Sequence, residues 1–207
     1  MSHRANLQRA RLLLVTDPRP DLAERVEAAV RGGVDIVQFR EKRSSREEAL
    51  PLAEELRDIC ERGGALFTVN DDAELAKASG AAGLHIGQED GKLSAARDVL
   101  GDEPFIGRSA GTMEEAREAV AEGADYLGVG AVYATPTKPD GDVAGLGFIR
   151  ELARSGLPVP WFAIGGVTLD AAPEVAEAGA WGFAVVRAVL DAEDPENAAR
   201  EMRNFLR

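Results

Sequence analysis

The chain has 207 residues, of which 36 are acidic and 24 are basic, and its formal net charge is −12 at neutral pH. This acidic balance argues against a general nucleic-acid binder, which would carry a basic face. The apolar fraction of 45% and the charged fraction of 29% are typical of a globular domain with a sizeable core. The single cysteine, Cys60, excludes a disulfide framework and a CxxC zinc site. We expect an inert thiol on a helix, in a reducing compartment.

No stretch of the sequence approaches the roughly eighteen consecutive apolar residues of a membrane span. Residues 1–9 are too polar to form the apolar core of a secretory signal. We therefore expect a cytoplasmic protein that acts on small molecules and has neither a membrane nor a nucleic-acid partner. The sequence leaves open whether it forms a homo-oligomer.

Short runs rich in Val, Ile and Leu alternate along the chain with segments of helical periodicity. Runs that are apolar at every position are typical of parallel strands covered on both faces. The expected strands are residues 11–16, 35–39, 66–70, 83–86, 104–108, 126–129, 161–164 and 182–186. The expected helices include residues 21–31, 46–61, 113–122, 171–177 and 195–206.

This alternation fits either a closed (βα)8 barrel or a doubly wound open sheet. A helix–glycine–strand pattern recurs at the second, fourth, sixth and eighth strands, with Gly33, Gly80, Gly123 and Gly179 at its centre. We expect each glycine to end its helix in a left-handed conformation. A repeating unit of two βα pairs favours the barrel. The length is close to the lower bound of about 200 residues for this fold. We therefore expect a single α/β TIM-barrel domain with parallel strands over residues 1–207, with residues 1–10 as an N-terminal extension.

In such a barrel the functional residues gather just after the strands, at their carboxyl ends. Asp71 and Asp90 follow the third and fourth expected strands. Mg²⁺ takes one or two protein carboxylates and completes its shell with water and substrate phosphates. Loop aspartates often only cap helices, however, as we expect for Asp72, so the residues alone leave the metal site open. We do not expect zinc, because His85 is the only histidine inside the expected fold and there is no thiol cluster.

Three cations are expected near these carboxylates. Arg40 and Lys42 lie two residues apart, so in an extended segment they point the same way, and Lys138 follows a Thr-Pro-Thr turn. Cations beside two Mg²⁺ ligands are what a departing diphosphate needs, because its charge must be neutralised. For any one of them the alternative is a surface ion pair, for example with Glu41.

A glycine pair indicates a second anion site. Gly165 and Gly166 follow the seventh strand, and Val186 and Arg187 close the eighth. In barrels these two loops often hold a phosphate on backbone N–H groups. The expected mouth has no Ser/His or Cys/His arrangement, and His85 is interpreted as a structural histidine. A reaction driven by the departure of diphosphate needs no strong protein base.

Five strings resemble the thiamine phosphate synthase (thiamine-phosphate pyrophosphorylase) family in order and spacing. They are Val37-Gln-Phe-Arg-Glu-Lys42, Val69-Asn-Asp71, His85-Ile-Gly-Gln-Glu-Asp90, Thr135-Pro-Thr-Lys138 and Ile164-Gly-Gly166. The resemblance implies Mg²⁺-dependent transfer of the hydroxymethylpyrimidine group from its diphosphate to the ring nitrogen of hydroxyethylthiazole phosphate. The products would be thiamine phosphate and diphosphate, formed by a dissociative mechanism.

The resemblance also implies a role for each matching residue. One Mg²⁺ per subunit would be held by Asp71 and Asp90. The catalytic residues would be Arg40, Lys42, Ser109 and Lys138. The pyrimidine diphosphate would be bound by Gln38, Phe39, Arg40, Glu41, Lys42, Asn70, Ser109 and Lys138. The thiazole phosphate would be bound by Thr135, Pro136, Thr137, Gly166, Val186 and Arg187.

The chain departs from the family pattern at three positions. Gly111 stands where the family often has histidine, Ala134 replaces a usual proline, and Arg187 stands where many members have serine. None of these changes removes a metal or diphosphate ligand that the resemblance implies.

Three other interpretations remain. A thiazole tautomerase shares the fold and the thiazole phosphate site, but it typically lacks the full diphosphate and Mg²⁺ set and uses a histidine where Gly111 lies. A sugar-phosphate epimerase or a tryptophan-pathway isomerase would need an acid–base pair at the mouth. A non-catalytic barrel that binds thiazole phosphate or thiamine phosphate would keep the site without turnover.

Overall fold

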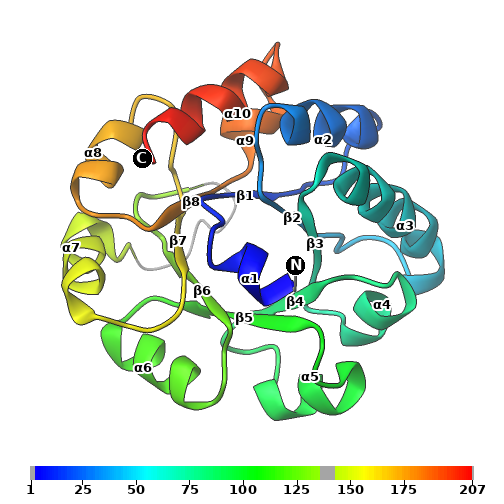
Figure 1. The fold of residues 1–207 in the computed structure, drawn as a ribbon, viewed down its shortest axis with the longest axis horizontal. Coiled ribbons are helices and arrows are strands. Elements are labelled where there is room, and N and C mark those ends of the chain that lie inside the picture. The colour runs from blue at the N-terminus through cyan, green and yellow to red at the C-terminus, as the bar shows by residue number, and fades with distance from the viewer. Residues whose placement is uncertain (1–2, 136–142, 207) are drawn as a thin grey trace.

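The structure is a computed structural model that describes residues 3–135 and 143–206. Its eight strands are all parallel and close into a barrel in which each strand pairs with the next and β8 pairs with β1 (Figure 1). The predicted barrel is therefore confirmed. The strands are β1 (Leu12–Val15), β2 (Ile36–Phe39), β3 (Leu66–Asn70), β4 (Gly83–Ile86), β5 (Phe105–Ala110), β6 (Tyr126–Gly130), β7 (Trp161–Ile164) and β8 (Gly182–Val185).

Helices surround the barrel as an outer layer (Figure 1). They are α2 (Leu22–Arg31), α3 (Arg46–Gly63), α4 (Ala73–Ala78), α5 (Leu93–Leu100), α6 (Met113–Ala121), α7 (Gly145–Ser155), α8 (Ala172–Glu177), α9 (Arg187–Leu190) and α10 (Pro195–Asn204), with α1 (His3–Leu7) before the first strand. Across the described residues, no helix combines the length and the apolar character that crossing a membrane requires.

The four recurring glycines end helices as expected. Gly33, Gly80, Gly123 and Gly179 have φ angles of 102°, 68°, 95° and 95°, in the left-handed region that glycine enters without steric cost. Each of them turns the chain from a helix back toward the next strand of the barrel.

Large rings and small residues alternate inside the barrel. Tyr126 on β6 is fully buried and packs edge-on against Phe105 and Phe162, with ring centroids 5.8 Å away in both cases. A Cβ atom at Gly107 on the neighbouring β5 would lie 2.1 Å from the Tyr126 ring. Glycine at position 107 therefore makes the room that this ring occupies, and the barrel interior is a packed core rather than a channel.

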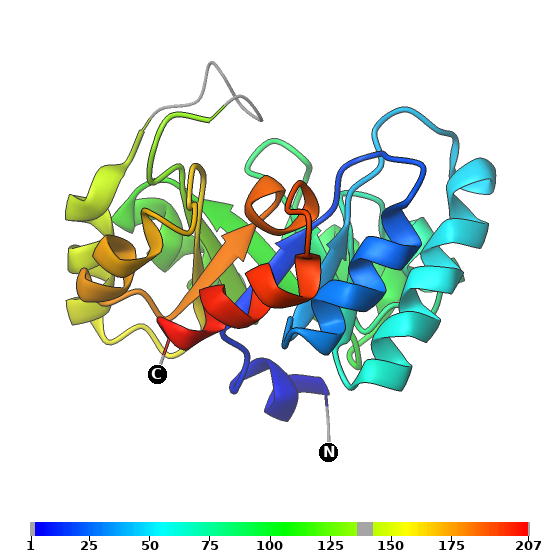
Figure 2. The same ribbon diagram turned by 90° about the horizontal axis from the view of Figure 1, so that it is seen from above.

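The N-terminal segment closes the lower end of the barrel. Leu7 at the end of α1 and the following Ala10 are each 1% exposed and share a buried cluster with Leu13 and Ile36 from inside the barrel. Figure 2 shows α1 beneath the strands, on the side opposite the loops that follow them. The residues expected as an extension thus form part of the core, and the upper end is left for a site.

Cys60 gives the first testable prediction. It lies on α3 with no exposed surface, and burial raises the pKa of its thiol to about 12. Since the thiolate is the reactive form, we expect iodoacetamide to leave Cys60 unmodified in the native protein at pH 8 and to modify it fully in denaturant. Mass spectrometry of the intact chain measures both states. Native labelling at the rate of a free thiol would contradict the burial.

Candidate functional site

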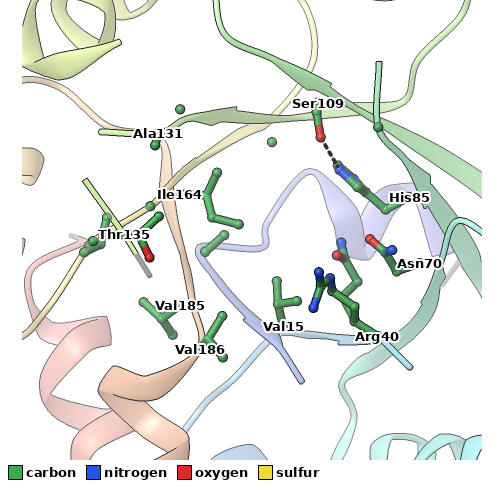
Figure 3. A pocket seen from close by; sticks show the side chains of 18 of the residues that line it. Val15, Arg40, Asn70, His85, Ser109, Ala131, Thr135, Ile164, Val185 and Val186 are labelled. Carbon is green, nitrogen blue, oxygen red and sulfur yellow. Dashed lines mark hydrogen bonds between the residues drawn. The ribbon is translucent and has the colours of Figure 1, made fainter. Parts of the chain in front are cut away.

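A cavity of about 230 Å³ opens at the carboxyl ends of the strands (Figure 3). Every strand contributes one inward-facing side chain or a glycine to its wall or floor. These residues are Val15, Gln38, Asn70, His85, Ser109, Gly128, Ile164 and Ala184, in the order β1 to β8. The closed barrel therefore places residues from the whole chain around one small space.

Most of the residues that the sequence singled out line this cavity. They are Gln38, Arg40, Lys42, Asn70, Asp71, Asp90, Ser109, Thr135, Gly166, Val186 and Arg187. The side chains of Phe39 and Glu41 lie elsewhere: the Phe39 ring packs outside the barrel against Phe67, with centroids 6.4 Å apart. The Glu41 carboxylate accepts hydrogen bonds from the backbone N–H groups of residues 43 and 44. Pro136, Thr137 and Lys138 lie outside the described residues.

Two carboxylates meet on one side of the cavity. Asp71 and Asp90 both line the cavity, close enough for each carboxylate to influence the other, and the ammonium group of Lys42 lies 3.4 Å from Oδ2 of Asp71. Burial, and then the neighbouring carboxylate of Asp90, raise the pKa of Asp71, while Lys42 opposes this shift. Like charges at such close range resist simultaneous ionisation, so the pair favours a bound proton or a bound cation.

The backbone at Asp71 is held in an uncommon conformation. Its φ angle is 65°, in the left-handed region that few residues other than glycine, asparagine and aspartate adopt. Its N–H donates to the carbonyl of His85 at 2.8 Å, which ties the end of β3 to β4. Strained positions of this kind persist where the surrounding structure fixes them, and they cluster at functional sites.

Asp72 has a different role from Asp71. Its Oδ1 accepts the backbone N–H of Leu75 at 2.9 Å at the start of α4, and its carboxylate pairs with Arg46 at 2.9 Å. Although burial opposes it, the hydrogen bond from Arg46 holds the pKa of Asp72 below its ordinary value. The expected helix cap is thus confirmed: Asp72 caps α4, whereas the adjacent Asp71 lines the cavity.

A buried polar chain forms part of the cavity floor. His85 is 7% exposed; its Nδ1 lies 3.0 Å from the Tyr126 hydroxyl and its Nε2 lies 3.0 Å from Oγ of Ser109. Figure 3 shows the second contact as a dashed line. Gln38 donates to the same hydroxyl at 3.4 Å. Burial raises the pKa of Tyr126, so its hydroxyl stays neutral, and both ring nitrogens of His85 serve this network. This agrees with the interpretation of His85 as a structural histidine.

The opposite wall is built from backbone. Gly165 and Gly166 have φ angles of 94° and 69°, and a Cβ atom on Gly166 would lie 2.7 Å from Cβ of Tyr133. The loop after β6 lies directly against them, since the N–H of Tyr133 donates to the carbonyl of Gly165 at 3.0 Å. Glycine is needed here both for the turn and for the close approach, and Val186 and Arg187 complete this wall.

Sequence reasoning did not include several lining residues. Val15, Gly128 and Ala184 line the cavity but carry little chemistry that a motif would reveal. His85 and Ile164 also line it; both lie in the strings that resemble the family, but neither was expected to bind a substrate. The available signal is the pleat: successive strand residues face opposite sides. A residue two positions before a known lining residue therefore faces inward as well.

The donor set fits a hard divalent cation such as Mg²⁺. Within residues 3–135 and 143–206, no cluster of three or more histidine, cysteine, aspartate or glutamate side chains is arranged to hold a metal. Two carboxylates do converge, which is the number that Mg²⁺ typically takes from a protein when a substrate phosphate and water supply the other oxygens.

The fold and the cavity place the chain among (βα)8-barrel proteins whose cavity, partly lined by charged and polar side chains, lies at the carboxyl ends of the strands. Residues 12–189 match the family model for thiamine monophosphate synthase. The chain belongs to this family.

Relatives and solved structures agree with this assignment. A thiamine-phosphate synthase from Gloeobacter violaceus is 50% identical over 93% of this chain, and one from Thermosynechococcus vestitus is 46% identical over 95%. The chain spans only about half, 56%, of each of these two relatives. A thiamine-phosphate synthase from Mycobacterium sp. (strain KMS) is 45% identical, with 97% of this chain and 94% of the relative covered. The solved thiamine phosphate pyrophosphorylase from Pyrococcus furiosus is 36% identical, with a TM-score of 0.88 over 98% of this chain and 96% of that one.

Replacing Asp71 by asparagine tests the cost of the carboxylate pair. The pKa of Asp71 is raised in the folded state, so as the pH rises this carboxyl loses its proton in the unfolded chain first. The stability of the fold therefore falls as the pH rises from the ordinary pKa of about 4 to the raised one. Asparagine removes this cost and tolerates the left-handed backbone. We expect Asp71→Asn to raise the melting temperature of the metal-free protein at pH 7 by a few degrees, and by less at pH 4.

Asp72→Asn is the matched control, because the pKa of Asp72 is lowered in the folded state. Its effect has the opposite sign: a loss of stability at pH 7 that fades as the pH falls below about 4. Thermal denaturation followed by circular dichroism measures both variants. An Asp71→Asn protein less stable than the parent at pH 7 would rule out the unfavourable carboxylate pair.

Proposed function

We propose that this protein is a thiamine phosphate synthase. It joins a hydroxymethylpyrimidine diphosphate to a hydroxyethylthiazole phosphate and releases diphosphate. The membership of the family and the relatives of that name support this proposal, and so does one observation in particular. The carboxylates of Asp71 and Asp90 lie beside Lys42 and Arg40, across the cavity from a glycine-lined wall.

Under this proposal the first wall binds the diphosphate. Arg40 and Lys42 supply positive charge for its oxygens, and Asn70 and Ser109 lie where the attached pyrimidine ring is held. Asp71 and Asp90 hold one Mg²⁺, which when bound neutralises charge on the diphosphate. Preorganised charge of this kind is the largest contribution when a reaction is limited by the departure of an anion.

The second wall holds the thiazole phosphate. The backbone of Gly166 and Val186 offers N–H groups to its oxygens, and Arg187 adds a full charge at the rim. Bound opposite the diphosphate, the thiazole ring presents its nitrogen to the carbon from which the diphosphate departs. The C–O bond breaks with its electron pair on the diphosphate, and the nitrogen lone pair forms the new C–N bond. No protein base takes a proton in this step, in keeping with the engagement of both His85 nitrogens.

The other interpretations make different use of the same cavity. A thiazole tautomerase needs a group that moves a proton, and here Gly111 provides no side chain for it, while the N–H of Gly111 donates to Glu115. A non-catalytic phosphate-binding barrel has no need of the carboxylate pair, whose raised pKa reflects an unfavourable arrangement.

The proposal is tested by mixing the purified protein with both substrates and Mg²⁺ and measuring thiamine phosphate with and without EDTA. We expect product only with the metal, because EDTA leaves the two carboxylates and the diphosphate in mutual repulsion. Thiazole phosphate binding without any product would favour the tautomerase or the non-catalytic barrel. Product formed in the presence of EDTA would contradict the proposed role of Mg²⁺ in the reaction.

Two substitutions, each removing one positive charge, test whether the two walls bind different ligands. We expect Arg40→Met to weaken the binding of Mg²⁺–diphosphate by about ten- to a hundredfold, the equivalent of one charge-assisted contact, and to leave thiazole phosphate binding unchanged. Arg187→Met should do the reverse, with a smaller loss because Arg187 is exposed. Calorimetry with each ligand alone measures both constants. Equal losses for both ligands in either variant would contradict the assignment of separate walls.

A further inference from the structure

Arg108 lies next to the cavity without facing it. It is on β5 between Ala110 and Ile106, which pack into the outer core with the helices, while Ser109 faces inward. The Arg108 side chain is almost fully buried, at 8% exposure. A buried guanidinium is costly unless its N–H groups are satisfied, so the position of its acceptors shows what it stabilises.

The acceptors of Arg108 all belong to the loop between β4 and α5, residues 87–92. Nη1 donates to the carbonyl of Gly91 at 2.6 Å, and Nη2 donates to the carbonyl of Gln88 at 3.0 Å and lies 3.5 Å from its side-chain oxygen. Gln88 in turn donates to the carbonyl of Ser109 at 2.6 Å. The loop is therefore fastened to β5 from both directions.

These contacts bracket Asp90. Gln88 precedes it by two residues and Gly91 follows it directly, so one guanidinium fixes the backbone on both sides of the carboxylate. Within the loop, Oδ2 of Asp90 accepts the N–H of Gly87 at 2.9 Å, and Asp90 lines the same cavity as Asp71. Asp90 is itself exposed, so the burial of its own side chain does not hold it in place.

We propose that Arg108 is a positioning residue for Asp90: it holds the loop of residues 87–92 so that the Asp90 carboxylate faces Asp71. This inference deepens the proposed function. The part of it that concerns metal binding rests on that function. Partners that orient a metal ligand typically change metal affinity by roughly ten- to a hundredfold when they are removed. A planar two-point donor is required, since Arg108 reaches two carbonyls at once and a lysine ammonium lacks that fork.

The test uses Arg108→Met and the milder Arg108→Lys, with Arg97→Met as the matched control. Arg97 on α5 also donates to two backbone carbonyls, those of Gly101 and Pro104, but at the opposite end of β5, where it also pairs with Asp125 at 3.0 Å. Hydrogen–deuterium exchange of the ligand-free protein reports on the loop, and calorimetric titration of Mg²⁺ in the presence of inorganic diphosphate reports on the metal.

We expect faster amide exchange across residues 87–92 and a roughly ten- to hundredfold weaker Mg²⁺ affinity in Arg108→Met, with a smaller change in Arg108→Lys. Arg97→Met should leave both readouts as in the parent, and thiazole phosphate affinity should be the same in all variants. Unchanged exchange of the loop in both Arg108 variants, or faster exchange throughout the molecule, would overturn the proposal.

The two proposals fail in different ways. If the parent protein binds no Mg²⁺ with diphosphate while Arg108→Met still loosens the loop, the positioning role stands and the proposed function falls. If the parent binds the metal and the Arg108 variants bind it equally well, the proposed function stands and the role of Arg108 falls.

Discussion

The pairing of β8 with β1 is the constraint on which the rest of the structure depends. Leu12 pairs with Phe183 and Leu14 with Val185, and this register closes eight parallel strands so that all their carboxyl ends lie at one rim. Without the closure, Arg187 and Arg40 would lie at distant edges of an open sheet. The closed rim brings two groups of polar residues close enough together to contact two small molecules bound side by side. Neither group is a specific motif by itself.

The rim concentrates unfavourable electrostatics in a chain that is already strongly acidic. The half-buried carboxylate of Asp71, on left-handed backbone, lies beside the exposed carboxylate of Asp90. A buried arginine, Arg108, donates to loop carbonyls instead of to a carboxylate. A packed barrel with fully buried rings such as Phe105 and Phe162 supplies the stability that offsets these costs. The hydrophobic core beneath the site thus stabilises the fold without taking part in the chemistry of the site.

The sequence predicted the barrel and its strands to within two residues at each end, because parallel strands covered on both faces are apolar without interruption. It also predicted the helix-ending glycines and the separation of Asp71 from the helix cap Asp72. The helices it singled out do not include α1, α4, α5, α7 or α9. Three of these, α1, α4 and α9, have only four to six residues, which gives a periodicity little room to develop. Nor did it foresee that Leu7 closes the barrel, because that contact depends on tertiary packing.

The pleat explains which members of a motif line the cavity. In the string from Val37 to Lys42, the residues at even positions, Gln38, Arg40 and Lys42, line it, whereas the side chains of Phe39 and Glu41 lie in the outer core and in the loop. A contiguous string therefore overstates a site by about a factor of two wherever it runs through an extended segment. The same alternation directs Ser109 inward and Arg108 outward. Residues on the outer face of a strand reach the chemistry only through the loops they hold, which is why the structure, and not the string, assigns a role to Arg108.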